Sequence, residues 1–159
     1  MSIRITPFLW FDGNAEEAAN FYVSIFKNSK IRSIAHYPKG TPGPAGSVMT
    51  VDFELEGQQY TALNGGPHFK FNEAVSFVVH CKTQKEVDRY WDALTADGGK
   101  PVQCGWLTDK YGLSWQIVPE IMLKWNLGKE PKKTQAAFKA MMKMVKLDIA
   151  KLKAAYDKG

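Results

Sequence analysis

The chain repeats one order of predicted elements, and this internal duplication is the strongest constraint on its fold. The first half is expected to run strand, helix, strand, strand, strand, over residues 3–11, 15–26, 31–37, 47–55 and 58–63. The second half repeats strand, helix, strand, strand, over residues 74–80, 84–96, 100–108 and 113–118. One such unit leaves one face of its sheet uncovered, so we expect two units to pack together.

The predicted fold is therefore α+β, with two βαβββ-type modules that form a pseudo-barrel around a shared cavity. Residues 1–120 make up this domain, with modules at 1–67 and 73–119. A helical extension follows at 121–159, with a short helix over 121–127 and a longer helical stretch over 132–156. Asp148 can restart the helix there as an N-cap.

Both module helices begin with the spacing of a capping box. Asn14 precedes the first helix and Glu17 follows three residues later, and Thr83 and Glu86 repeat this pattern at the second helix. The sequence therefore predicts Asn14 and Thr83 as N-caps.

The closing hairpin of the second module spans residues 104–118. Its turn is expected at 109–112, and a bend near Cys104 and Gly105 is expected to split the preceding strand. Because side chains alternate along a strand, Trp115 and Ile117 should face a helix, and Ser114 and Gln116 should face a wetter side.

Charge is concentrated in the extension. Residues 1–123 hold 11 Lys and Arg against 13 Asp and Glu, whereas residues 124–159 hold 10 Lys against 3 acids and have no Arg. Nucleic-acid faces usually mix Arg and aromatic side chains with Lys, so no nucleic-acid partner is predicted. The apolar stripe of the extension is expected to cover its own domain or a second subunit.

Composition also bounds the location. No apolar run reaches the roughly 18 residues of a membrane span, and the N-terminus lacks a signal-peptide pattern, so no membrane partner is predicted. Two cysteines, Cys81 and Cys104, do not make a disulfide framework, although a single disulfide stays open. We therefore predict a cytoplasmic protein.

Several segments together resemble a known family. They are 14–18 with Phe21 and Tyr22, 63–67, 76–79, 86–94 and 104–116. They are similar to the PhnB-like branch of the glyoxalase/bleomycin resistance/dioxygenase (vicinal oxygen chelate) superfamily, a branch also labelled 3-demethylubiquinone-9 3-methyltransferase-like. The resemblance extends into the extension, and it implies paired βαβββ modules and a homodimer.

The methyltransferase label does not match the residues. Enzymes that use S-adenosylmethionine usually have a Gly-rich loop after a first strand, in a doubly wound sheet. Here the corresponding turn, residues 11–14, contains one glycine in a short chain.

The resemblance also implies where a metal would lie. Metal-dependent members of the superfamily use His and Glu from strands of both modules, and the matching positions here are Thr6 or Pro7, Asn64, Ser76 and Gln116. This neutral set lacks the His and carboxylate ligands that transition metals prefer, so we predict no metal and no cofactor.

The remaining prediction is a small-molecule ligand in the cavity between the modules. The polar candidates are Asn64, Ser76 and Gln116, the aromatic walls are Trp10, Phe8 and Trp106, and His80 lies at the rim. Alternatively, these polar groups satisfy one another through buried water.

Two other functions stay open. One is a lyase, isomerase or transferase that uses His80, His68 or Cys104 with a borrowed metal, although a buried and inert Cys104 is expected. The other is an interaction module that acts through its basic extension.

Overall fold

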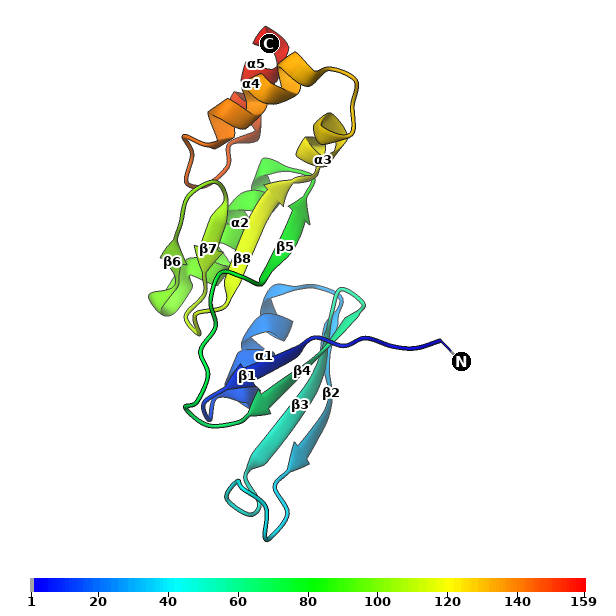
Figure 1. Cartoon of the computed structure of the whole chain (residues 1–159), viewed down its shortest axis with the longest axis vertical. Coiled ribbons are helices and arrows are strands. Elements are labelled where there is room, and N and C mark those ends of the chain that lie inside the picture. Colours follow the sequence, from blue (N-terminus) through cyan, green and yellow to red (C-terminus); the bar gives the residue numbers. More distant parts are fainter. Residues whose placement is uncertain (1) are drawn as a thin grey trace. The chain divides into compact units, whose positions relative to one another are not determined.

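The computed structural model describes residues 2–159, and the chain divides into two compact units (Figure 1). The first unit ends at Phe71 and the second begins at Asn72. Each unit is one α/β module with its own sheet and its own helix, as the duplication predicts, and closure of the two into a pseudo-barrel stays a prediction.

The first unit has four strands and one helix: β1 (Phe8–Phe11), α1 (Ala15–Ile25), β2 (Ser29–His36), β3 (Val48–Leu55) and β4 (Gln58–Asn64). The sheet order is β1-β4-β3-β2, with β1 parallel to β4 and the other pairs antiparallel. The structure thus confirms the predicted element order.

α1 covers one face of this sheet. Its Tyr22 is fully buried and stacks on Phe53 of β3 at 6.2 Å between ring centroids. Leu9 and Phe11 of β1 are buried on this side, whereas Phe8 is 60% exposed on the other. We call the sheet face opposite α1 the first open face.

The first strand is shorter than the predicted 3–11. β1 pairs with β4 in a parallel register that places Phe8 beside Thr61, and the same register would place Ile5 beside Gln58, the first residue of β4. Residues before Ile5 therefore have no strand to pair with, and the N-terminal segment runs away from β1 (Figure 1). Ile3 and Ile5 are 92% and 87% exposed.

The second unit repeats the arrangement with β5 (Ser76–Cys81), α2 (Gln84–Thr95), a 3₁₀ turn η1 (Ala96–Gly98), β6 (Lys100–Pro101), β7 (Trp106–Thr108) and β8 (Ser114–Pro119). The order is β5-β8-β7-β6, with β5 parallel to β8. Cys104 and Gly105, with φ values of +60° and +83°, separate β6 from β7, which confirms the predicted split.

The two helix starts differ from each other. Thr83 caps α2 as predicted, because its Oγ1 accepts from the Glu86 N–H at 3.2 Å. Asn14 occupies the N-cap position of α1 as predicted, but its side chain makes no cap hydrogen bond. Instead, Asn64 at the end of β4 accepts from the Ala15 N–H at 2.8 Å. A side chain 49 residues away thus satisfies an N–H that α1 itself leaves open.

The extension folds onto the second unit as α3 (Glu120–Asn126), α4 (Pro131–Met141) and α5 (Ile149–Lys158) (Figure 1). Asp148 caps α5 through the Lys151 N–H at 3.0 Å, which confirms the predicted restart. Met122, Leu147 and Leu152 form a buried cluster, and Trp125 stacks on Tyr156 at 4.4 Å. Part of the apolar stripe therefore covers its own unit, while other residues of it stay exposed, among them Phe138 and Met142.

Gln84 joins the extension to α2. Its amide donates to the Leu147 carbonyl at 3.1 Å and accepts from the Ile149 N–H at 2.8 Å. Beside it, the Lys146 ammonium, 2.8 Å from Asp88, and the Gln84 amide lower the pKa of the Asp88 carboxyl. Along residues 2–159, no helix combines the length and the apolar character needed to cross a bilayer.

The closing hairpin depends on one buried carboxylate. Asp109 is 3% exposed and accepts from the Tyr111 N–H at 2.8 Å, the Leu113 N–H at 3.1 Å and the Trp115 indole at 2.9 Å. It fixes the turn and the orientation of the largest side chain on β8.

We therefore expect Asp109→Ala to lower the free energy of unfolding by about 2–4 kcal/mol, because it leaves these donors without an acceptor. Urea denaturation measures this, with the exposed Asp157→Ala as the control, for which we expect a change within about 0.5 kcal/mol. Equal effects of the two substitutions would contradict the role of Asp109.

Candidate functional site

Four of the six predicted site residues lie on one face of the second sheet. Ser76 and His80 of β5, Trp106 of β7 and Gln116 of β8 all point away from α2, because their strand neighbours Trp115, Ile117 and Cys81 are buried. We call this the second open face. The alternation predicted for the closing hairpin is therefore confirmed for Trp115, Gln116 and Ile117, whereas Ser114, predicted on the wetter side, is only 1% exposed.

Gln116 lies at the centre of this face. The register places Val78 beside it on β5 and Trp106 beside it on β7, so the amide has apolar side chains on both flanks. Its Nε2 donates to the Ser76 Oγ at 2.9 Å. Among the residues that the structure describes, no partner approaches the Gln116 Oε1, which leaves a half-buried acceptor for a ligand.

His80 lies on the same face but apart from this pair. It is exposed and sits beside Val118 of β8, two residues along β5 from Val78. No hydrogen bond or ion pair joins it to Cys104 in the described part of the second unit. A histidine needs such a partner to act as an oriented base, and the structure does not provide it there.

Asn64, in the first unit, has a structural role. Besides capping α1 through Ala15, its Nδ2 donates to the Val48 carbonyl at 3.1 Å, and its own carbonyl accepts from the Tyr37 hydroxyl at 2.6 Å. The side chain thus ties β4 to α1 and β3. The sequence left open that the polar candidates only satisfy one another's hydrogen bonds through buried water. Asn64 is satisfied in this way, but by protein groups instead of water.

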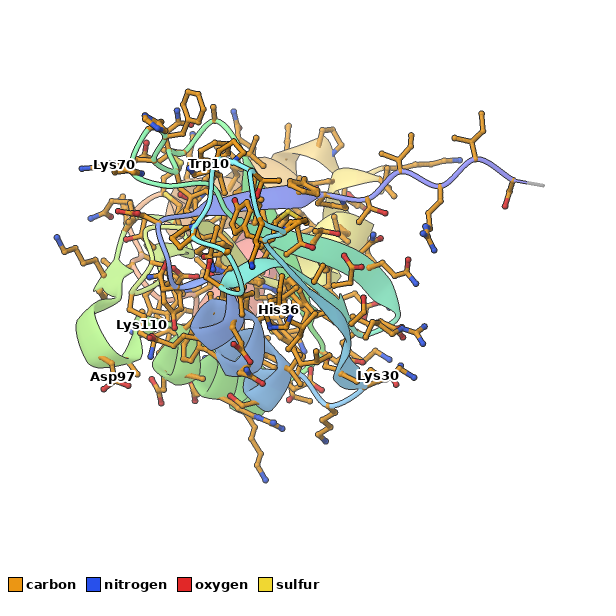
Figure 2. The ribbon with its side chains drawn as sticks, turned by 90° about the horizontal axis from the view of Figure 1, so that it is seen from below. Trp10, Lys30, His36, Lys70, Asp97 and Lys110 are labelled. Atoms are coloured by element: carbon orange, nitrogen blue, oxygen red, sulfur yellow. The ribbon has the colours of Figure 1, made fainter. Side chains whose placement is uncertain are left out.

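Trp10 also makes its polar contact within the first unit. Its indole donates to the Gly66 carbonyl at 2.8 Å, and its ring meets Phe69 edge-on at 4.8 Å. The side chain of Trp10 is labelled in Figure 2. Gly65 passes so close beneath the ring that a Cβ there would overlap it. Trp10 therefore anchors the segment that follows β4, while its ring remains half-buried.

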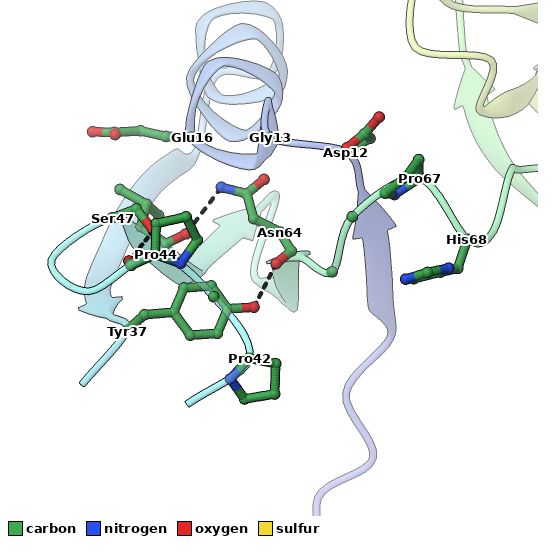
Figure 3. A pocket seen from close by; sticks show the side chains of 14 residues that line it. Asp12, Gly13, Glu16, Tyr37, Pro42, Pro44, Ser47, Asn64, Pro67 and His68 are labelled. Carbon is green, nitrogen blue, oxygen red and sulfur yellow. Dashed lines mark hydrogen bonds between the residues drawn. The ribbon is translucent and has the colours of Figure 1, made fainter. Parts of the chain in front are cut away.

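A cavity of about 590 Å³ opens beside Asn64 (Figure 3). Asp12 and Glu16 lie on either side of the start of α1, and His68 lies on the side of Asp12. The opposite wall comes from Tyr37 and the Pro- and Gly-rich loop after β2, which the sequence identified only as a loop. In the sequence, Tyr37, which directly precedes that loop, was the residue that could have indicated this wall of the cavity.

Metal ligands do not gather at the predicted positions. Ser76 and Gln116 are hydrogen-bonded to each other, and the Asn64 side chain is hydrogen-bonded to the backbone of Ala15 and Val48. Within residues 2–159, no group of three or more His, Cys, Asp or Glu is placed to hold a metal ion. The donors present are neutral amides and hydroxyls, which do not fit the divalent ion that the superfamily's metalloenzymes hold.

The two cysteines are free and differ in environment. Cys81 is 1% exposed, and burial, with a smaller effect of Glu86, raises the pKa of its thiol to about 12. Cys104 is half-buried, with its Sγ 3.7 Å from the Met142 Sδ, so the expectation of a buried thiol there is only partly met.

Known proteins share this architecture and much of this sequence. The model of the 3-demethylubiquinone-9 3-methyltransferase family matches residues 3–118. The chain belongs to this family. A putative 3-demethylubiquinone-9 3-methyltransferase, the PhnB protein from Bacillus cereus, is 39% identical, with a TM-score of 0.66 over 74% of this chain and 99% of that one. No curated protein matches the chain.

More distant structures share the fold. Protein PA1353 from Pseudomonas aeruginosa gives a TM-score of 0.62 at 21% identity, over 75% of this chain and 98% of that one. The fosfomycin resistance protein FosX from Listeria monocytogenes, complexed with Mn(II) and sulfate, gives 0.52 at 14% identity, over 75% and 90%. The chain therefore shares the fold of these proteins, as the resemblance implied, whereas the family match ends at residue 118, before the extension.

The cysteine environments predict different reactivities. Because only a thiolate attacks a disulfide reagent, Cys81 should stay unmodified by an aromatic disulfide at pH 8 in the folded protein. We expect one fast thiol per chain, absent in Cys104→Ser, and two after denaturation. A fast-reacting Cys81 in the folded Cys104→Ser variant would contradict this.

Proposed function

We propose that this protein binds a small organic molecule without a metal ion, and that the ligand lies on the second open face. The observation that carries the proposal is the hydrogen-bonded pair of Ser76 and Gln116 between Val78 and Trp106. Small-molecule sites have this composition, with mostly apolar walls and a few directed polar groups.

The chemistry of the pair indicates the ligand class. With one Gln116 N–H donated to Ser76, the amide keeps its carbonyl oxygen and a second N–H for a ligand. The pair carries no charge, and Trp106 adds a half-buried indole ring. A neutral aromatic or apolar compound with one hydrogen-bonding group fits these features.

The family's methyltransferase label is not supported by the first unit. The turn between β1 and α1 has one glycine, Gly13, and the first helical N–H, that of Ala15, is bound by Asn64. The unit is a four-stranded mixed sheet, whereas cofactor sites of the doubly wound type lie at the carboxyl ends of a parallel sheet. We therefore do not propose S-adenosylmethionine as a ligand of this protein.

The alternative is an enzyme, a lyase, isomerase or transferase, that acts on a similar small metabolite. His80 favours it, because this histidine shares the second open face with Gln116. Its exposure and the lack of a described partner weigh against it, and binding without catalysis needs fewer groups. A homodimer in the cytoplasm is part of the same proposal.

A thermal-shift screen of neutral aromatic compounds tests the proposal. We expect a compound that raises the melting temperature of the natural protein equally with and without EDTA. Gln116→Ala should weaken its binding by roughly tenfold, because it removes two hydrogen-bonding groups, while Gln135→Ala on the exposed side of α4 should not. Shifts abolished by EDTA, or equal in all three proteins, would reject the proposal.

Substitution Gln116→Glu tests the role of the neutral amide. We expect weaker ligand binding, because a half-buried carboxylate beside Trp106 prefers water to an apolar compound. We expect no stoichiometric binding of Mn²⁺ or Zn²⁺ by calorimetry, since one carboxylate lacks further His or acidic ligands. Tight metal binding to the variant would show that the remaining ligands are already in place and favour the enzyme.

A further inference from the structure

We propose a separate site for a small monocarboxylate on the first open face, between Arg4 and Arg32. The site is a cavity of about 380 Å³ in the first unit, and its other lining residues are Thr6, Asp52, Phe53, Gln59, Tyr60 and Thr61. It shares no residue with the proposed ligand site of the second unit, so either site can fail without the other.

The distribution of arginine singles out this cavity. The chain has 18 Lys and only 3 Arg, and two of the three arginines, Arg4 and Arg32, line this one cavity. The third, Arg89, lies over the ring of Tyr90 at 5.5 Å on α2. A guanidinium binds a carboxylate through two parallel hydrogen bonds, which the point charge of Lys cannot do.

The strand register brings the two arginines to opposite sides of a polar floor. Arg32 lies on the edge strand β2, and Arg4 precedes β1 at the other edge. Between them, Glu54 of β3 pairs with Gln59 of β4, and the β1 register carried back two residues places Thr6 beside Gln59. Three strand spacings of about 4.8 Å separate the edges, a span that two Arg side chains and a small ligand can fill.

The acids of this face are already satisfied. The Asp52 carboxylate accepts from the Ser33 hydroxyl at 2.9 Å and from the Thr61 hydroxyl at 2.6 Å. Glu54 is held by the Arg32 guanidinium at 2.6 Å, which uses one of five N–H donors. The two arginines and the two acids sum to no net charge, but within the described residues Arg4 has no partner, so its guanidinium retains its N–H donors for a ligand.

The same acids define the class of anion. Each further negative charge on a ligand is repelled by Asp52 and Glu54, so a monoanionic carboxylate is favoured over a dianionic phosphate ester. Phe8, 60% exposed on this face beside Thr61, offers apolar surface for the body of the ligand. An aromatic monocarboxylate therefore fits the cavity.

Amide NMR spectra of the full chain test this with benzoate, with benzamide as its neutral isostere, and with phenyl phosphate as the dianion. We expect benzoate to shift the amide signals of Thr6, Gln59 and Thr61 with a dissociation constant of about 1 mM, and the other two compounds to bind at least tenfold more weakly. The effect should weaken as salt is added.

Arginine variants identify the side chains responsible. Arg4→Ala and Arg32→Ala should each weaken benzoate binding by about tenfold or more, since each removes charge-assisted hydrogen bonds. Arg89→Ala, the matched control, should leave it unchanged. Because Arg32 also holds Glu54, Arg4→Gln provides a variant that removes the charge without touching an ion pair.

Several results would overturn the assignment. Equal binding of benzamide and benzoate would remove the role of charge, and tighter binding of phenyl phosphate would contradict the carboxylate class. No benzoate shift by about 10 mM, or benzoate binding within twofold of the natural protein in both Arg4 variants, would reject the site. Shifts confined to Gln116 and Trp106 would assign benzoate to the other site and reject this one.

Discussion

Each sheet in this protein is covered on one face by a single helix, and this constraint determines where every candidate function can lie. α1 buries Val51, Phe53 and Ala62 of the first sheet, and α2 buries Trp115 and Ile117 of the second. Because strand side chains alternate, the other half of each strand is directed to a face that this helix does not cover, although the extension packs against Val118 at one end of β8. Polar and aromatic residues collect there, and both proposed sites use such a face.

Local signals made much of the fold predictable. The repeated element order, the Thr83 cap and the break at Cys104 and Gly105 all depend on residues close together in sequence. The assignment of Gln116 to a face was equally local, since a period of two needs only one strand and one known buried neighbour such as Trp115. These features follow from backbone geometry, and the structure confirms them.

The features that the sequence did not predict share a different cause. Asn14 holds the N-cap position, but Asn64 supplies the side-chain acceptor because the parallel pairing of β1 and β4 brings the end of β4 to the start of α1. The strand predicted from Ile3 begins only at Phe8, and residues before Ile5 lie beyond the first residue of β4 in the shared register. The convergence of Arg4 and Arg32 also needs a register across four strands. None of these three features can be predicted from one strand or helix alone.

The amide at position 116 explains why a metal-free site is physically consistent. An amide donates to Ser76 and remains uncharged, so position 116 needs no cation to balance it. A carboxylate at this half-buried position would lose hydration and require a cation or a basic partner, and the flanking Val78 and Trp106 supply neither. The choice of amide over acid therefore favours ligands recognised through hydrogen bonds and apolar contact, and it separates this site from the arginine-lined cavity of the first unit.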